Sequence, residues 1–261
     1  MEHINDIIKD MGNIKEAIKK MNQNIPQEDM ESLSNNACPL CKGLGALHPF
    51  INGIPDYSKT IPCICMRDIN RAKRKTQLLK YCELPPMADD MNFSNFKVYQ
   101  EVKEAYKAAK YVADNPQKNH WLVMMGSNDT GKTHLAISIC KAWINKGIPS
   151  KYSFVPLLLD ELREGFGKDG NESYTERFKR FCNVPLLVLD DLGAEVPKPW
   201  VQEKLETLID YRLMNKLSLV VTTNKSMDEL SPRMSSRLVR HPDSILIAIS
   251  ASEYTMRRSR K

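Results

Sequence analysis

The amino-acid sequence predicts an α/β fold in which a parallel β-sheet surrounds a phosphate-binding loop, with a small zinc-binding domain in front of it. Three observations lead to this prediction. The apolar run Trp121–Met125 is followed by a loop, Gly126–Thr133, that fits the pattern G-x-x-x-x-G-K-[ST]. A second apolar run ends in the acids Asp190 and Asp191. Four of the seven cysteines are clustered between positions 38 and 65.

The composition indicates a globular protein with one large domain or two smaller ones, since 42% of its 261 residues are apolar and 27% are charged. No apolar run is long enough to cross a bilayer, and the first residues lack the basic and apolar regions of a signal peptide. We therefore expect a cytoplasmic protein without a membrane partner. The net charge of +6 permits contact with nucleic acid, and the odd number of cysteines argues against a disulfide framework.

The segment Ile4–Met21 carries isoleucines and methionines three and four positions apart, which predicts an amphipathic helix. This helix either packs on its own domain or offers a face to a partner protein. A polar stretch that contains Pro26 follows it, and we interpret this stretch as a linker.

Two cysteine pairs, Cys38 with Cys41 and Cys63 with Cys65, are separated by 21 residues that include several glycines and prolines. We expect turns rather than long elements in this segment. Four thiolates can hold Zn²⁺ in a tetrahedral site, and a small domain with little core needs such a site in order to fold. His48 is an alternative ligand. The sequence therefore predicts a structural zinc site at the four cysteines.

The basic segment Met66–Lys80 predicts a helix, which is either a solvated connection or a surface that contacts phosphates. Leu84-Pro85-Pro86 then interrupts regular structure. We therefore expect an N-terminal domain over residues 1–80 and a nucleotide-binding domain over residues 84–261.

The phosphate-binding loop lies between a strand, Trp121–Met125, and a helix, Lys132–Asn145, as its motif requires. Backbone N–H groups of the loop and of the helix N-terminus would face the phosphates of ATP. Lys132 would reach the outer phosphates, and the Thr133 hydroxyl would coordinate Mg²⁺. The predicted nucleotide-binding residues in this stretch are Gly126, Ser127, Asn128, Asp129, Thr130, Gly131, Lys132, Thr133 and His134.

The remaining segments alternate between helical and strand patterns. Helices are predicted at Tyr99–Ala113, Leu157–Phe166, Tyr174–Phe181 and Trp200–Leu213. Strands are predicted at Lys151–Val155, Pro185–Asp191, Leu217–Asn224 and Ser244–Ser250.

Polar groups at the ends of these strands predict the chemistry of the site. Asp190 would hold Mg²⁺ through its water shell, and Asp191 would orient or deprotonate the attacking water, with Glu195 as the competing base. Asn224 would hydrogen-bond the attacking water or the γ-phosphate. Arg237 belongs to a short basic helix, where it is either a surface residue or a group that enters the ATP site of a neighbouring subunit.

These motifs together resemble an AAA+ ATPase, and most closely the DnaC/DnaI-type helicase loaders of bacteria and phages. The resemblance covers about residues 67–261. Motifs of that group recur as Arg71-Ala-Lys-Arg74, Leu84-Pro-Pro, Phe93-Ser-Asn-Phe96, Gly131-Lys-Thr-His-Leu135, Asp190-Asp-Leu-Gly193 and Ile209-Asp-Tyr-Arg212. The resemblance implies a five-stranded parallel sheet in the order 5-1-4-3-2. It also implies that there is no helical lid, and only 11 residues follow Ser250.

By this resemblance, Asn224 is sensor 1, Arg237 is the arginine finger, and Arg257 or Arg258 is sensor 2. Two positions differ from the usual pattern. Asp129 stands where many relatives have glycine, and an aspartate tolerates the left-handed conformation better than most residues. Asp191 stands where most AAA+ proteins have glutamate, and the shorter base suggests slow ATP hydrolysis that is stimulated by DNA or by oligomerisation.

The resemblance also implies a function: a homo-oligomer that docks on a replicative hexameric DNA helicase through its zinc-binding region and binds ATP and single-stranded DNA. The segment Leu157–Asn183 is either the surface that faces DNA or an ordinary amphipathic helix pair. Its basic and aromatic groups are Lys168, Arg177, Lys179, Arg180, Phe166 and Phe178. Three other functions fit less well: a transposition helper ATPase on duplex DNA, a small-molecule P-loop kinase, and a binding module with a vestigial ATPase.

Overall fold

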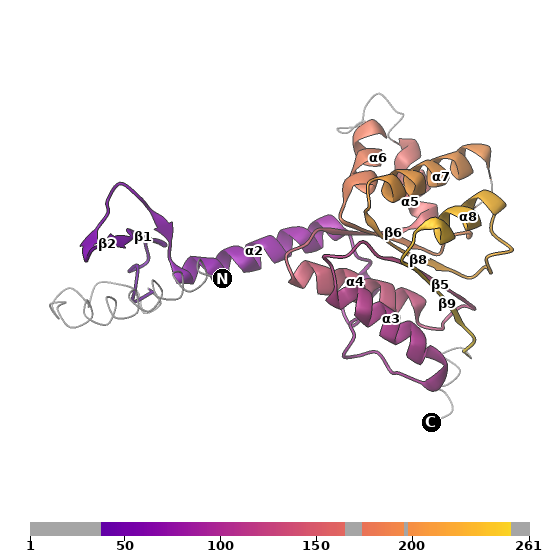
Figure 1. Cartoon of the computed structure of the whole chain (residues 1–261), viewed down its shortest axis with the longest axis horizontal. Helices are drawn as coiled ribbons and strands as arrows, with labels where there is room; N and C mark the ends of the chain where they lie inside the picture. Colours follow the sequence, from indigo (N-terminus) through magenta and orange to yellow (C-terminus); the bar gives the residue numbers. More distant parts are fainter. Residues whose placement is uncertain (1–37, 165–173, 196–197, 252–261) are drawn as a thin grey trace. The chain divides into compact units, whose positions relative to one another are not determined.

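The computed structural model describes residues 38–164, 174–195 and 198–251 (Figure 1). The chain divides into two compact units between Lys73 and Arg74, inside helix α2 (Ile64–Cys82). Among the described residues, no helix is long and apolar enough to cross a membrane. Several sequence predictions concern positions outside the described residues, namely those for Ile4–Met21, Phe166, Lys168, Arg257 and Arg258.

The first unit contains two very short antiparallel strand pairs. β1 (Ala46–Leu47) pairs with β4 (Ile61–Pro62), and β2 (Phe50–Ile51) pairs with β3 (Ile54–Pro55). The turn between β2 and β3 places Gly53 at a φ of 83°, a conformation that favours glycine. Turns therefore dominate the described residues of this unit before α2, in agreement with their glycine and proline content.

Helix α2 extends further than the sequence pattern indicates, because Ile64 and Cys65 precede the predicted start and Tyr81 and Cys82 follow the predicted end. The basic side chains of α2 within the described residues are exposed. One of them, Arg74, donates from Nη2 to the backbone carbonyl of Gly147 at 3.1 Å. This bond ties the second half of the helix to the nucleotide-binding unit.

The second unit is built on a five-stranded parallel sheet in the order β6-β7-β8-β5-β9. If β5 to β9 are numbered 1 to 5 in chain order, the observed order is 2-3-4-1-5. This is the predicted order 5-1-4-3-2 read from the opposite edge of the sheet. The strands are β5 (Trp121–Gly126), β6 (Ser150–Phe154), β7 (Leu186–Asp190), β8 (Ser218–Thr223) and β9 (Ser244–Ile249).

Helices cover both faces of this sheet (Figure 1). Alternate strand residues point to opposite faces, so Leu122 and Met124 join one hydrophobic cluster and Trp121 and Val123 join the other. The first cluster includes side chains from α3 (Lys103–Asp114) and α4 (Lys132–Asn145). The second includes side chains from α5 (Val155–Glu164), α6 (Tyr174–Asn183), α7 (Pro199–Met214) and α8 (Pro232–Arg240).

Element boundaries differ from the sequence predictions by a few residues. The segment predicted as one helix from Tyr99 consists of a 3₁₀ turn, η3 (Gln100–Val102), followed by α3. Helix α5 begins at Val155, two positions before its predicted start, because Pro156 is tolerated in the first turn of a helix. A second 3₁₀ turn, η2 (Pro86–Ala88), follows the proline break.

Candidate functional site

A cavity of about 870 Å³ lies at the carboxyl-terminal edge of the sheet. This is the edge at which open α/β sheets bind ligands. One wall comes from the phosphate-binding loop, and a second comes from the ends of β6, β7 and β8, including Asp190, Asp191 and Asn224. The third wall comes from the segment between α2 and α3, including Met91 and Phe96.

The phosphate-binding loop needs glycine at two positions. A Cβ atom on Gly126 would lie 2.4 Å from the carbonyl oxygen of Ile249, and one on Gly131 would lie 2.8 Å from Cε2 of Phe96. Both glycines also have φ values that side chains disfavour, 148° and 91°. Asp129 adopts a left-handed φ of 56°, as expected for an aspartate that replaces glycine in this loop.

The Lys132 ammonium is buried and surrounded by oxygen atoms. It donates to the backbone carbonyls of Gly126 at 2.8 Å and Ser127 at 2.7 Å, and to Oδ1 of Asn224 at 2.9 Å. Burial lowers the pKa of Lys132, and the nearby carboxylates of Asp191 and Asp190 oppose this shift. Two loop carbonyls and the Asn224 side chain, which follows β8, therefore hold the ammonium charge. The motif predicts that this ammonium contacts the phosphates of the nucleotide.

Three hydroxyl groups surround the buried carboxylate of Asp190. Thr133 donates to both oxygens, at 3.0 and 3.1 Å. Thr222 donates to Oδ1 at 2.6 Å, and Tyr152 donates to Oδ2 at 2.6 Å. Burial raises the pKa of the Tyr152 hydroxyl, and Asp190 raises it further, so this group remains a donor. Thr133 and Asp190 thus lie together, as the sequence predicts for a pair that holds Mg²⁺.

Asp191 follows β7 in a left-handed conformation, with a φ of 61°. Its backbone N–H donates to the Thr222 hydroxyl at 2.9 Å, and its Oδ1 accepts a 2.6 Å bond from Nδ2 of Asn224. Burial raises the pKa of Asp191, as does the neighbouring Asp190 carboxylate, while Lys132 lowers it. The Asn224 amide therefore bridges Lys132 and Asp191.

Of the other predicted site residues, His134 lines the cavity, whereas Glu195 and Arg237 do not. Glu195 accepts a 2.8 Å bond from the Gly193 N–H and is not among the residues that line the cavity. His134 lines the cavity, and its Nε2 lies 2.9 Å from the carbonyl oxygen of Asn92. Arg237 is on α8 and pairs with Asp210 rather than lining the cavity.

The apolar wall of the cavity and the contact of Tyr152 with Asp190 are not predicted by the sequence motifs. The apolar wall includes Pro85, Met87, Met91, Phe96 and Tyr99. The motif Phe93-Ser-Asn-Phe96 recurs in the family that the sequence resembles, but the motif alone does not indicate that Phe96 lines the cavity. For Tyr152, the signal was its position in a buried strand, because a buried tyrosine hydroxyl requires a hydrogen-bond partner.

The predicted DNA-facing segment is partly described. Phe178 stacks on Tyr174, with ring centroids 5.8 Å apart, and packs against the core. Lys179 is exposed on the same helix, α6.

The four cysteines of the first unit form one cluster. All four Sγ atoms lie within 4.8 Å of one another, with Cys38 to Cys63 at 3.7 Å and Cys41 to Cys65 at 3.4 Å. Tetrahedral Zn²⁺ with Zn–S bonds of about 2.3 Å requires sulfur atoms about 3.8 Å apart, so the cluster fits this ion. Backbone N–H groups of Cys41 and Leu40 lower the pKa of Cys38 to about 6, whereas the hydrogen bond with Cys41 and burial raise the pKa of Cys65, so Cys38 is the thiol that ionises more readily.

His48 lies outside this cluster within the described residues, and its Nδ1 is 2.8 Å from the carbonyl oxygen of Lys59.

Comparison with known proteins finds similarity to ATP-binding replication proteins. The profile of the IstB-like ATP binding protein family matches residues 63–239. The chain is 24% identical over 172 residues to the replicative helicase loader DnaC of Escherichia coli K12, covering 65% of this chain and 70% of that protein. It is 23% identical over 237 residues to the replicative helicase loader DnaI of Bacillus subtilis 168, covering 87% of this chain and 74% of that protein. A crystal structure of the DnaC helicase loader superposes with a TM-score of 0.52 at 27% identity, covering 64% of this chain and 100% of that one.

Proposed function

Because the chain belongs to the family of IstB-like ATP binding proteins, with an AAA+ fold, we propose that it is an ATP-dependent helicase loader. In this role it would bind a replicative hexameric DNA helicase and place it on single-stranded DNA at the initiation of replication. The observation that carries the proposal is the similarity to the loader DnaI, which spans 87% of the chain. That span extends beyond the ATP site into the N-terminal part of the chain.

The ATP site supports this proposal through the groups that it brings together. The residues from Gly126 to His134 would hold ATP, with Lys132 at its outer phosphates. Thr133 and Asp190 would hold Mg²⁺, which would neutralise phosphate charge. Asp191 and Asn224, joined by a 2.6 Å bond, would position the attacking water. Arg237 would act on the ATP of a neighbouring subunit, because it does not line the cavity of its own.

Slow hydrolysis that depends on DNA or on assembly follows from two features. The base, Asp191, is shorter than glutamate and already engaged with Asn224. In addition, Arg237 would reach an ATP site only from a neighbouring subunit, so the site would be complete only after assembly. A loader needs ATP as a switch, so slow turnover suits the function.

The zinc-binding region, within residues 1–80, is the part that we assign to helicase docking. Large apolar side chains are exposed on this unit, among them Leu44 (83%), Ile54 (71%) and Tyr57 (74%). Exposed apolar side chains mark a protein interaction site where they form a contiguous patch. Zn²⁺ bound at the four cysteines would hold in place the short strands and turns that carry these apolar side chains.

Single-stranded DNA would bind along the Leu157–Asn183 segment. Support comes from the exposed Lys179 and from the basic residues of α6. Because phosphate contacts release counterions, affinity for a single-stranded oligonucleotide should fall steeply with salt. Absence of affinity at low salt, both with and without ATP, would contradict this part of the proposal.

A loading assay tests the function as a whole. The full-length chain, a replicative hexameric helicase, ATP and circular single-stranded DNA that carries one annealed oligonucleotide are combined, and release of the oligonucleotide is followed with and without the chain. The chain should stimulate unwinding on the closed circle, and Lys132→Ala should not. If the chain does not bind the helicase and does not stimulate it, the proposal is wrong.

The second candidate is a transposition helper ATPase that binds duplex DNA. It would use the same ATP site, and the matching family is described as IstB-like. Competition between duplex and single-stranded oligonucleotides of equal length distinguishes the two functions, since preference for the duplex favours the helper.

A further inference from the structure

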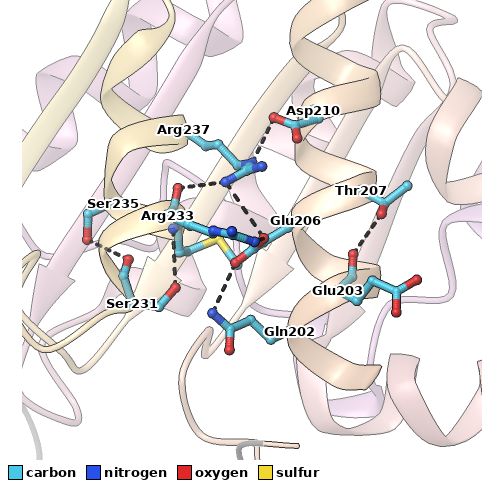
Figure 2. Close-up of polar contacts among 10 residues, drawn as sticks. Gln202, Glu203, Glu206, Thr207, Asp210, Ser231, Arg233, Ser235 and Arg237 are labelled. Atoms are coloured by element: carbon cyan, nitrogen blue, oxygen red, sulfur yellow. Dashed lines mark hydrogen bonds and ion pairs between the residues drawn. The ribbon is translucent and has the colours of Figure 1, made fainter. Parts of the chain in front are cut away.

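Helix α7 carries three polar side chains four residues apart, Gln202, Glu206 and Asp210, which lie on one face of the helix (Figure 2). Gln202 donates from Nε2 to Oε1 of Glu206 at 3.0 Å. The Glu206 side chain is only 10% exposed, while that of Asp210 is 35% exposed. Two carboxylates are thus presented side by side to the neighbouring helix, α8.

Arg237 reaches these carboxylates from α8 (Figure 2). Its Nε donates to Oδ1 of Asp210 at 2.8 Å. Its Nη1 donates to the backbone carbonyl of Arg233 at 3.1 Å and lies 3.7 Å from Oε2 of Glu206. Among the residues that the structure describes, Nη2 of Arg237 takes part in no hydrogen bond or ion pair.

The short bond at Nε differs in its effect from the longer contact with Glu206. The donors of a guanidinium are arranged in a rigid planar fork, so a bond at Nε fixes the direction of the other donors. At 3.7 Å, Glu206 attracts the charge without fixing its direction. Asp210 is therefore the side chain that sets the orientation of the guanidinium, together with the backbone carbonyl of Arg233, and the N–H groups of Nη2 remain for another oxyanion.

We propose that Asp210 is a positioning residue for Arg237 and holds its guanidinium in the orientation needed to stabilise phosphate charge in a neighbouring subunit. This inference rests on the proposed trans role of Arg237. Preorganisation of this kind lowers the activation free energy, because an arginine that is already oriented needs no reorganisation when the transition state forms. An ion pair between partly exposed side chains contributes little to stability, so the main effect of Asp210 should be on turnover.

Four variants of the full-length chain test the inference by ATP hydrolysis with Mg²⁺ and a single-stranded oligonucleotide. Arg237→Ala should hydrolyse little ATP while binding it normally. Asp210→Ala should lower kcat by about 10- to 100-fold with an unchanged KM for ATP. Asp210→Asn should recover most of the rate, because its amide oxygen can still accept from Nε. Arg233→Ala, which removes a charge from the same helix at a side chain that is 79% exposed, should behave as wild type.

A mixing experiment separates positioning from general damage. Lys132→Ala subunits should not bind ATP but keep Arg237 and Asp210, and Asp210→Ala subunits keep their own ATP site. An equal mixture should hydrolyse ATP faster than either variant alone, because the first supplies a positioned arginine to the second. An effect of Asp210 within its own subunit would not be rescued in this way.

The outcomes are distinguishable. Normal hydrolysis by Asp210→Ala, together with an inactive Arg237→Ala, would overturn the positioning inference and leave the trans role intact. Normal hydrolysis by Arg237→Ala would overturn the trans role itself. Loss of activity in Asp210→Ala without rescue by mixing would place its effect within one subunit and would also contradict the inference.

Discussion

The ammonium of Lys132 lies 2.9 Å from Oδ1 of Asn224, although the two residues are 92 positions apart in the chain. The same Asn224 amide donates to Asp191 at 2.6 Å. One side chain thus connects the cation that would face the phosphates with the carboxylate that would face the water. A phosphate oxygen that takes a place at Lys132 must replace one of its present oxygen partners. We expect this exchange to change the Asn224 contacts and thereby couple ATP binding to Asp191.

Lys132→Ala should weaken ATP binding strongly, because it removes the buried cation of the loop. A hydrogen bond to a charged group contributes about 1.5–3 kcal/mol, so the Kd for ATP should rise by roughly 10- to 100-fold or more. Titration calorimetry with ATP and Mg²⁺ measures the change. Zinc content should stay at the wild-type value, since the cysteine cluster lies in the other unit. An unchanged Kd would show that the nucleotide site is wrongly assigned.

Tyr152→Phe should weaken the response to Mg²⁺, because the Tyr152 hydroxyl orients the Asp190 carboxylate at 2.6 Å. Loss of a residue that orients a metal ligand typically costs 10-fold or more in metal affinity, so half-maximal hydrolysis should need about tenfold more Mg²⁺. Tyr106→Phe is the matched control, because it removes a hydroxyl from a tyrosine that packs against the same hydrophobic cluster. Equal Mg²⁺ dependence in both variants would argue against the positioning of Asp190 by Tyr152.

The pH dependence of hydrolysis should reflect Asp191, whose pKa is raised first by burial and then by the Asp190 carboxylate. A base must be ionised, so kcat should fall as the pH drops through this raised pKa. The fall should lie above about pH 3.9, the ordinary value for aspartate. The effect on stability has the opposite direction: the fold favours the protonated acid, and this contribution is lost as the pH rises. A kcat profile that stays flat down to pH 4, where the protein is still folded, would contradict the assignment.

Removal of zinc should unfold the first unit and leave ATP binding intact. The thiolates occur in a unit of short strands and turns, where metal binding and folding are coupled. A chelator should therefore abolish helicase binding and reduce the zinc content, while the Kd for ATP stays unchanged. Cys63→Ser should have the same effect, and Cys182→Ala, in the core of the other unit, should retain zinc. Full helicase binding by a zinc-free protein would contradict the proposed docking role.

Arg212→Leu should destabilise the nucleotide-binding unit. Arg212 is fully buried and donates to the carbonyls of Phe181, Cys182, Pro185 and Ser218. Buried carbonyls without partners cost about 1–3 kcal/mol each, so the free energy of unfolding should fall by at least about 3 kcal/mol. Urea unfolding measures this change, with the exposed Arg233→Ala as the control. A change below about 1 kcal/mol would contradict the structural role of Arg212.

The groups at the strand ends could be predicted because local motifs specify them, whereas the strand order came from the family resemblance that those motifs support. The glycine loop, the acid pair and the strand that ends in Asn224 each have a local pattern, and parallel strands bring their carboxyl ends to one edge. The spacing of the cysteines likewise predicts a cluster that the structure confirms. The assignment of chemical roles to these residues stays a prediction.

Contacts between distant elements could not be predicted in the same way. Arg212 belongs to the recurring motif Ile209-Asp-Tyr-Arg212, but the motif does not name its partners, which the structure shows to be carbonyls from α6 and β8. Asp210 and Glu206 resemble the exposed acids of an amphipathic helix, and their contact with Arg237 depends on how α7 and α8 pack. No local pattern encodes these pairings, because they depend on tertiary packing.

The position of β5 between β8 and β9 has a consequence for protein synthesis. The strand that leads into the phosphate-binding loop has no sheet partner until Ser218–Thr223 has been translated, nearly 100 residues later. At about 5–20 residues per second, this interval lasts roughly 5–20 s. Throughout this time the apolar Trp121–Met125 strand has both edges open, which makes the nascent chain a candidate for chaperone binding. Because Asn224 contacts both Lys132 and Asp191, the ATP site can form, and nucleotide can stabilise the fold, only after Asn224 has been translated.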